Sequence, residues 1–206
     1  MVNRPKIKGT GAETLLVGYL RANGWPYAER RALSGSLDKG DIAGTGPLVW
    51  ESKATGGSPH IPAWLAETEA ERRNAGAEYG ILVVKTRGLG VVYMGRWLAV
   101  MSLPQHEKLV ANSTVKVLTS TSPRFYNSMR LSHEFTALGI DQAIMREAAE
   151  PGSCPGCPVV AAHMMPPGTQ DDPSRHYRAM RLEQMVHLLH GAGFGEIPHH
   201  GVQPGL

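Results

Sequence analysis

Hydrophobic and polar residues follow two different periods along the first half of the chain. Apolar residues at three- and four-residue spacing predict helices, and these cover residues 10–23, 61–77 and 104–111. Alternating or continuous apolar runs bounded by Gly and Pro predict strands, and these cover residues 27–33, 40–43, 47–54, 79–86, 91–94 and 97–103. The order of helix, three strands, helix, three further strands and a short helix is typical of an α/β fold around a mixed sheet.

Two of these segments carry the clearest signals. Residues 79–86 (YGILVVKT) are apolar on both strand faces, which predicts a central strand buried on both sides. In residues 10–23, Thr10 can cap the helix and Glu13 can complete a capping box. Glu13 also borders the apolar stripe of that helix, so it could face a neighbouring site. The two roles of Glu13 are compatible.

The pattern changes midway along the chain. Residues 124–149 have a helical pattern with an irregular apolar stripe, and residues 150–173 contain six prolines and both cysteines. Residues 174–192 predict a helix with an apolar face. We therefore predict a core over residues 1–112 and a mostly helical or irregular C-terminal extension, of unknown role, over residues 113–206.

Composition narrows the class of protein. The chain has 206 residues, of which 42% are hydrophobic and 19% charged, as in ordinary globular proteins. No apolar run approaches the roughly 20 residues of a membrane span, and no hydrophobic signal segment follows the basic start. We expect a protein without a membrane partner, in the cytoplasm of a bacterial or phage-infected cell. Two cysteines argue against a disulfide framework.

Charge is distributed unevenly between the two halves. Residues 1–112 contain 14 Lys and Arg against 10 Asp and Glu, whereas residues 113–206 contain 7 against 8. A positive N-terminal half attracts polyanions such as nucleic acids. The charge distribution therefore favours DNA as a partner of this half.

Three polar side chains converge in the predicted strands. Glu51 and Lys53 are two residues apart and therefore project from one face of a strand. Residues 44–47 (GTGP) have turn composition, which lets Asp41 return to the same point. Two carboxylates beside a lysine can hold a hard cation that orients and activates a water.

The spacing Asp41-x9-Glu51-x-Lys53, with Glu13 on an upstream helix, resembles the PD-(D/E)xK nuclease superfamily. Residues 30–36 (RRALSGS), directly before the first acid, narrow the resemblance to the archaeal-type Holliday junction resolvases. In that family a helical Glu, a turn rich in Ser and Gly, the Asp and then Glu-x-Lys follow in this order.

The resemblance covers roughly residues 8–95, and Gly40 stands where the superfamily name has proline. It implies a restriction-endonuclease-like α-β-β-β-α-β core with a mixed central sheet. It also implies Mg²⁺ or Mn²⁺ as cofactor, branched DNA as substrate and a homodimer that makes two symmetric nicks. A phage member of the family is compatible with the composition.

The resemblance also assigns roles within the site. Asp41, Glu51 and the carbonyl of Ser52 would bind Mg²⁺, and Lys53 would position the attacking water or help to deprotonate it. Glu13 would hold a second metal or a metal-bound water. The structural alternative is that Asp41 caps a turn while Glu51 and Lys53 form a surface ion pair.

Five further residues are candidates for DNA contacts. Arg30 and Arg31 fall on opposite strand faces, so at most one of them points toward a DNA groove. Ser34 and Ser36 could bind phosphate or a metal-bound water near the cut, and otherwise they are turn residues. Lys85 could reach the DNA backbone, and otherwise it is an ordinary lysine at a strand end.

A possible second metal site lies in the C-terminal half. Cys154 and Cys157 have the Cys-x2-Cys spacing of half a zinc site, and His163 and His176 are the nearest downstream histidines. Two reduced thiols or a redox pair are the alternatives.

These residues predict a Mg²⁺-dependent endodeoxyribonuclease, most similar to a Holliday junction resolvase in DNA recombination and repair. A related endonuclease that cuts flaps or specific sequences is the nearest alternative. A non-catalytic DNA-binding module, or an interaction module organised by zinc, is the alternative from another class. The acid and lysine positions are all filled, which favours the enzyme.

Overall fold

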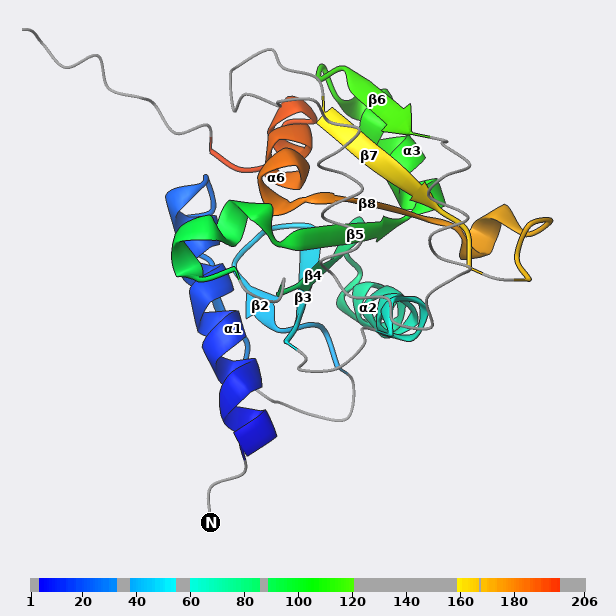
Figure 1. The fold of residues 1–206 in the computed structure, drawn as a ribbon. Helices are drawn as coiled ribbons and strands as arrows, with labels where there is room; N and C mark the ends of the chain where they lie inside the picture. Colours follow the sequence, from blue (N-terminus) through cyan, green and yellow to red (C-terminus); the bar gives the residue numbers. More distant parts are fainter. Residues whose placement is uncertain are drawn as a thin grey trace, which may run out of the picture.

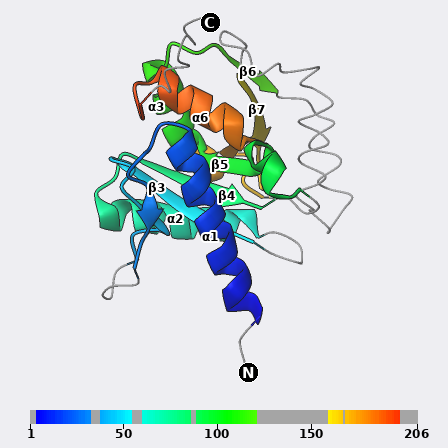
Figure 2. The same cartoon turned by 90° about the vertical axis from the view of Figure 1, so that its left-hand side faces the viewer.

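The computed structural model describes residues 4–32, 38–54, 60–85, 89–120, 159–166 and 168–196. They form three layers, with one mixed sheet between two layers of helices (Figures 1 and 2). The helices are α1 (Arg4–Ala22), α2 (Ile61–Ala75), α3 (Leu103–Asn112) and α6 (Leu182–Gly191). Two short 3₁₀ helices are η1 (Val91–Arg96) and η2 (Pro173–Arg175). None of the described helices is both long and apolar enough to cross a membrane.

The main sheet has six strands in the order β3-β4-β5-β8-β7-β6. Their bounds are β3 (Leu48–Lys53), β4 (Tyr79–Val84), β5 (Leu98–Ser102), β6 (Val117–Ser120), β7 (Val159–Met164) and β8 (Tyr177–Arg181). The β3–β4 and β6–β7 pairs are parallel, and the other three pairs are antiparallel. A separate antiparallel pair joins β1 (Glu29–Arg30) and β2 (Ile42–Ala43). The predicted α/β fold with a mixed sheet is therefore confirmed.

Strand β4 divides the core into two apolar clusters. All six of its residues are buried, as predicted for a central strand. Ile81 and Val83 belong to the cluster under α1 and α6, whereas Leu82 and Val84 belong to the cluster that contains Ile61 of α2. Alternate side chains of one strand thus fill the cores on both faces of the sheet.

Helix α2 lies where its sequence pattern predicts. Pro62 lies in the first turn, where a missing N–H costs no helical hydrogen bond. Gly76 ends the helix at φ +63°, and its N–H bonds the carbonyl of Arg73. One stripe of buried residues faces the sheet, and it consists of Ile61, Leu65, Thr68 and Glu71.

Three local predictions were wrong. Helix α1 begins at Arg4, so Thr10 lies inside the helix and does not open it with a capping box. The predicted strand over 27–33 is reduced to Glu29–Arg30, which pairs only with the short β2. Residues 91–94 form part of η1, because they connect β4 and β5 at the end of the sheet where no partner strand lies beside them.

The prediction of a mostly helical or irregular C-terminal extension was also wrong for the described residues. Strands β6, β7 and β8 extend the same sheet, and β8 pairs with β5 over five residues. The predicted helix over 174–192 begins with the end of η2, continues as strand β8 over Tyr177–Arg181 and is an α-helix only from Leu182. Pairing on both edges outweighs the helical pattern of residues 177–181. Residues 124–149 lie outside the described residues.

We predict that a chain ending at residue 112 does not fold. Removing β8 exposes the edge of β5 and uncovers Ala99 and Met101, which are fully buried in the complete chain. Circular dichroism and gel filtration of the truncated and complete chains measure this. A monomeric shortened chain with a cooperative thermal transition would contradict it.

Candidate active site

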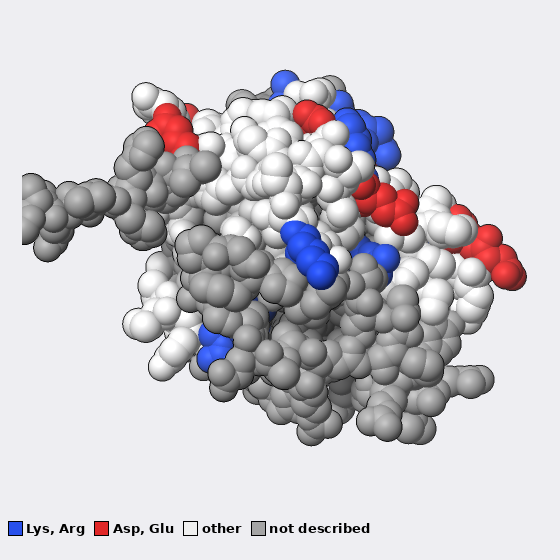
Figure 3. Space-filling model, turned by 90° about the horizontal axis from the view of Figure 1, so that it is seen from above, with Lys and Arg blue, Asp and Glu red and all other residues white. Residues whose placement is uncertain are grey.

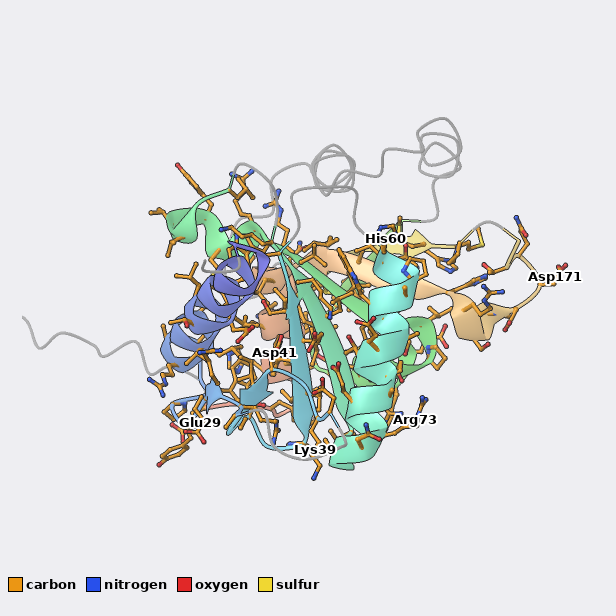
Figure 4. All side chains as sticks on the ribbon, turned by 90° about the horizontal axis from the view of Figure 1, so that it is seen from below. Glu29, Lys39, Asp41, His60, Arg73 and Asp171 are labelled. Carbon is orange, nitrogen blue, oxygen red and sulfur yellow. The ribbon has the colours of Figure 1, made fainter. Side chains whose placement is uncertain are left out.

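Strand β3 forms one edge of the main sheet, and Asp41 is fixed beside it. The N–H of Asp41 donates to the carbonyl of Trp50 at 3.0 Å. The N–H of Ser52 donates to Oδ2 of Asp41 at 2.8 Å. Backbone and side chain of Asp41 therefore both hold it against the open edge of β3, between α1 and α2 in the view of Figure 4.

Gly40 allows this close approach. Its φ is +84°, and a Cβ on it would lie 2.6 Å from Cγ1 of Val49 and 3.2 Å from the carbonyl of Trp50. Proline fixes φ near −65° and cannot adopt this conformation. A glycine directly before Asp41, and not a proline, thus follows from the backbone geometry there.

Glu51 and Lys53 project from the same face of β3, as predicted. Nζ of Lys53 lies 2.7 Å from Oε1 of Glu51. It also lies 2.9 Å from Oε2 of Glu67, which helix α2 contributes. The sequence also allowed a simple surface ion pair between Glu51 and Lys53. Glu51 is only 6% exposed, so the pair is largely buried on the Glu51 side.

The structure adds a carboxylate to the site that the sequence analysis missed. Glu71 on α2 is only 5% exposed, and its Oε2 is buried without a hydrogen-bond partner among the described residues. That oxygen lies 3.7 Å from the position of a Cβ on Gly40. The missed signal is the spacing of residues 61, 65, 68 and 71, which places Glu71 on the stripe that packs against the sheet.

Burial and mutual repulsion raise the pKa values of three carboxyls in the site. The pKa of Asp41 rises to about 7, chiefly through burial and then through the charge of Glu51. The pKa of Glu51 also rises to about 7 through burial, although the hydrogen bond from Lys53 opposes the rise. Burial and Asp38 raise the pKa of Glu71 to about 7. With all three carboxyls ionised, the cluster would carry more negative charge than its one lysine offsets, and the raised pKa values reflect this cost and that of burial.

Lys53 stays positively charged in this cluster. Burial alone would lower the pKa of its ammonium. The hydrogen bonds and charges of Glu51 and Glu67 outweigh burial and raise that pKa above its ordinary value. Lys53 therefore acts here as a hydrogen-bond donor and a positive charge.

The predicted roles of Glu13 and Arg30 change in the structure. Nε and Nη2 of Arg30 donate to Oε2 of Glu13 at 2.9 and 2.6 Å, so this arginine is directed at α1. Glu13 is close enough that its charge contributes to the raised pKa of Asp41. The N–H of Arg31 donates to the carbonyl of Asp41 at 2.7 Å, and its side chain reaches the carbonyl of Ile42 at 3.5 Å. Both arginines thus make contacts to the chain beside the site, while the side chain of Arg30 remains 42% exposed.

Among the remaining described candidates, the N–H of Lys85 donates to the carbonyl of Lys53 at 2.9 Å, whereas His163 lies in β7 and His176 directly before β8. Lys85 is exposed, and its Nζ lies 5.6 Å from the centre of the Trp97 ring. The rings of His163 and His176 meet, with 3.3 Å between Nε2 of His163 and Nδ1 of His176. The candidates Ser34, Ser36, Cys154 and Cys157 lie outside the described residues.

The donor set suits a hard cation such as Mg²⁺. No group of three or more His, Cys, Asp and Glu side chains in the described part of the chain has the arrangement of a metal site. Mg²⁺ requires only one or two carboxylates because it keeps several of its waters. Asp41 and Glu51 could supply these carboxylates, and the unpartnered oxygen of Glu71 could be a further donor. A divalent cation would offset both the burial of the carboxylates and their mutual repulsion, the two causes of the raised pKa values.

Basic side chains do not dominate the face shown in Figure 3. Lysines and arginines lie there among aspartates and glutamates. On the described part of this face, lysines and arginines do not form a single basic patch.

Comparison with protein-family models, curated proteins and solved structures found no match for the chain. Its function is therefore inferred from the site. The residues that carry the inference are Asp41, Glu51, Lys53 and Glu71.

We predict that Glu71→Gln stabilises the protein at pH 8 but not at pH 5, in buffer without divalent cations. The raised pKa means that the folded protein keeps the Glu71 carboxyl protonated up to about pH 7. Stability is therefore lost as the pH rises from the unfolded-state pKa toward pH 7. The variant avoids this loss and should gain about 1 kcal/mol in free energy of unfolding at pH 8. Urea titrations at both pH values measure the difference.

Glu67→Gln is the matched control on the same helix. Its carboxylate is 53% exposed and pairs with Lys53, so its loss should leave the free energy of unfolding unchanged or lower it. Burial lowers the pKa values of His106 and His163, so these residues make the free energy of unfolding rise with pH, opposite to Glu71. Because wild type and both variants share these histidines, reporting each variant relative to wild type removes their contribution. Equal effects of Glu71→Gln at pH 5 and pH 8 would contradict the raised pKa.

Proposed function

We propose that the protein is a Mg²⁺-dependent endodeoxyribonuclease. One observation carries the proposal, which is the convergence of Asp41, Glu51 and Lys53 at the open edge of β3. Two acids and a lysine at one edge of a sheet suit hydrolysis of a phosphodiester. The buried excess of negative charge supports a cation as part of the site.

The order of elements supports a restriction-endonuclease-like core within this proposal. Helix α1, strands β1, β2 and β3, helix α2 and strand β4 follow one another along the chain. This is the α-β-β-β-α-β order that the resemblance implies. Strands β3 and β4 are parallel, with Lys53 opposite Val84 in the register.

The residues of the site have distinct parts in the proposed reaction. Asp41 and Glu51, with the carbonyl of Ser52, would hold Mg²⁺, and Glu71 is a further candidate ligand. Bound Mg²⁺ would stabilise the negative charge that develops on the scissile phosphate. Lys53 would donate a hydrogen bond from its ammonium to the attacking water or the phosphate. Because its pKa is raised, Lys53 does not serve as the base that removes the proton.

Arg30 and Glu13 have a supporting part in the proposal. Their ion pair ties α1 to β1 and neutralises one carboxylate next to Asp41. Glu13 is therefore a positioning residue, unless DNA draws the guanidinium of Arg30 away. The proposal also includes preference for a four-way DNA junction and action as a homodimer. Both features rest on the family resemblance alone.

We predict that the complete chain cuts DNA with Mg²⁺, that EDTA abolishes cutting, and that Lys53→Ala reduces the rate at least about 100-fold. Labelled four-way junction, flap, linear duplex and single-stranded DNA are compared as substrates. Lys108→Ala is the matched control, because this lysine lies on α3 and pairs with Glu78 at 3.1 Å. It should cut like wild type.

The DNA substrates that the protein cuts distinguish between the alternative functions. Paired symmetric nicks in the junction support a resolvase, whereas metal-dependent cutting of the other substrates supports a flap or restriction-like endonuclease. DNA binding without any cleavage, unchanged in Lys53→Ala, would overturn the enzyme and leave a binding module.

A further inference from the structure

A second buried group of polar side chains lies on the opposite face of the sheet from Glu51 and Lys53. Arg178 in β8 is 9% exposed, and its Nε and Nη1 have no hydrogen-bond partner among the described residues. His106 on α3 is 3% exposed, and its Nε2 also has none there. Three buried polar nitrogens are thus unsatisfied within this group.

The register of the sheet brings these residues together. His163 in β7 lies directly opposite Arg178, and Met101 in β5 lies on the other side of it. Directly opposite residues have Cβ atoms about 5 Å apart on the same face. The first residue of α3, Leu103, donates its N–H to the carbonyl of His176 at 2.9 Å, which places the start of α3 beside β8.

The histidines of this group do not supply the missing partner. Nε2 of His176 lies 2.7 Å from the carbonyl of Thr169, so it donates there and leaves Nδ1 as an acceptor. Nε2 of His163 then donates to that Nδ1. Burial, and next the charge of Arg178, lower the pKa values of His106 and His163 to about 4. The guanidinium is therefore the positive charge of the group at neutral pH.

A buried guanidinium without hydrogen bonds is costly, and native structures satisfy such donors. No carboxylate lies within ion-pair distance of Arg178 in the described ranges, although the charge of Glu107 on α3 acts on it. The same positive charge opposes a cation such as zinc at the neighbouring histidine pair.

We infer that Arg178 and His106, with His163 beside them, form a binding site for an oxyanion of the phosphate class. The guanidinium offers a planar fork of N–H donors that fits two oxygens of a phosphate group. The unpartnered Nε2 of His106, as the protonated nitrogen of the neutral ring, supplies a further donor to the same anion. The source of the phosphate group is either free phosphate or the backbone of a nucleic acid. The inference does not rest on the proposed nuclease activity, because the site uses other residues on the other face.

The test is the thermal unfolding midpoint of the complete chain as inorganic phosphate replaces chloride at constant ionic strength. The midpoint of wild type should rise by about 3 °C when phosphate reaches ten times its dissociation constant. Arg178→Met should show no rise. Arg175→Met is the matched control, because Arg175 is an exposed arginine three residues away, and it should respond like wild type.

The variant Glu107→Gln tests whether the partner of Arg178 is a bound anion or the side chain of Glu107. If an anion binds, removing this nearby negative charge should tighten phosphate binding several-fold. If Glu107 is itself the partner of Arg178, the variant should be destabilised without phosphate and gain no affinity, which would overturn the inference. A response to duplex DNA and not to phosphate, lost in Arg178→Met, would support the same site with a nucleic-acid backbone as the source. Equal responses of wild type and Arg178→Met to both ligands would overturn it.

Discussion

Two hydrogen bonds between Asp41 and the edge strand β3 hold the candidate site together. One joins the backbone of Asp41 to Trp50, and the other joins its carboxylate to the N–H of Ser52. Every other feature of the site depends on this attachment, because it places a third carboxylate near Glu51 and Glu71 where burial weakens screening by water. The unusual backbone of Gly40 is the local condition that permits it.

The same sheet carries uncompensated charge on both faces. On the α2 side, burial raises the pKa values of three carboxyls, and repulsion between them adds to the rise because only one ammonium pairs with the cluster. On the α3 side, the guanidinium of Arg178 lacks partners for two of its nitrogens within the described residues. The buried carboxyls and the buried guanidinium each lower the free energy of unfolding. A bound ligand of opposite charge would restore part of that stability. A cation and an oxyanion are therefore the ligands that the two faces favour.

The C-terminal strands connect these two regions. Strand β8 lies between β5 and β7, and its residues fill both cores. Tyr177 and Ala179 join the cluster on the α2 side, while Met180 joins the one under α1 and α6. The N-terminal elements that bear Asp41 and Glu51 are thus part of a sheet that the distant C-terminal part of the chain completes.

The sequence by itself determined the features that depend on neighbouring residues. The apolar run of β4, the proline at the start of α2, and the shared face of Glu51 and Lys53 all follow from local periodicity and side-chain chemistry. Tertiary structure decided the rest. Pairing on both edges made residues 177–181 a strand despite their helical pattern, and packing of α2 on the sheet buried Glu71 beside Glu51. It also turned Arg30 toward Glu13. Such outcomes depend on contacts between residues far apart in the chain, and local patterns carry no record of those contacts.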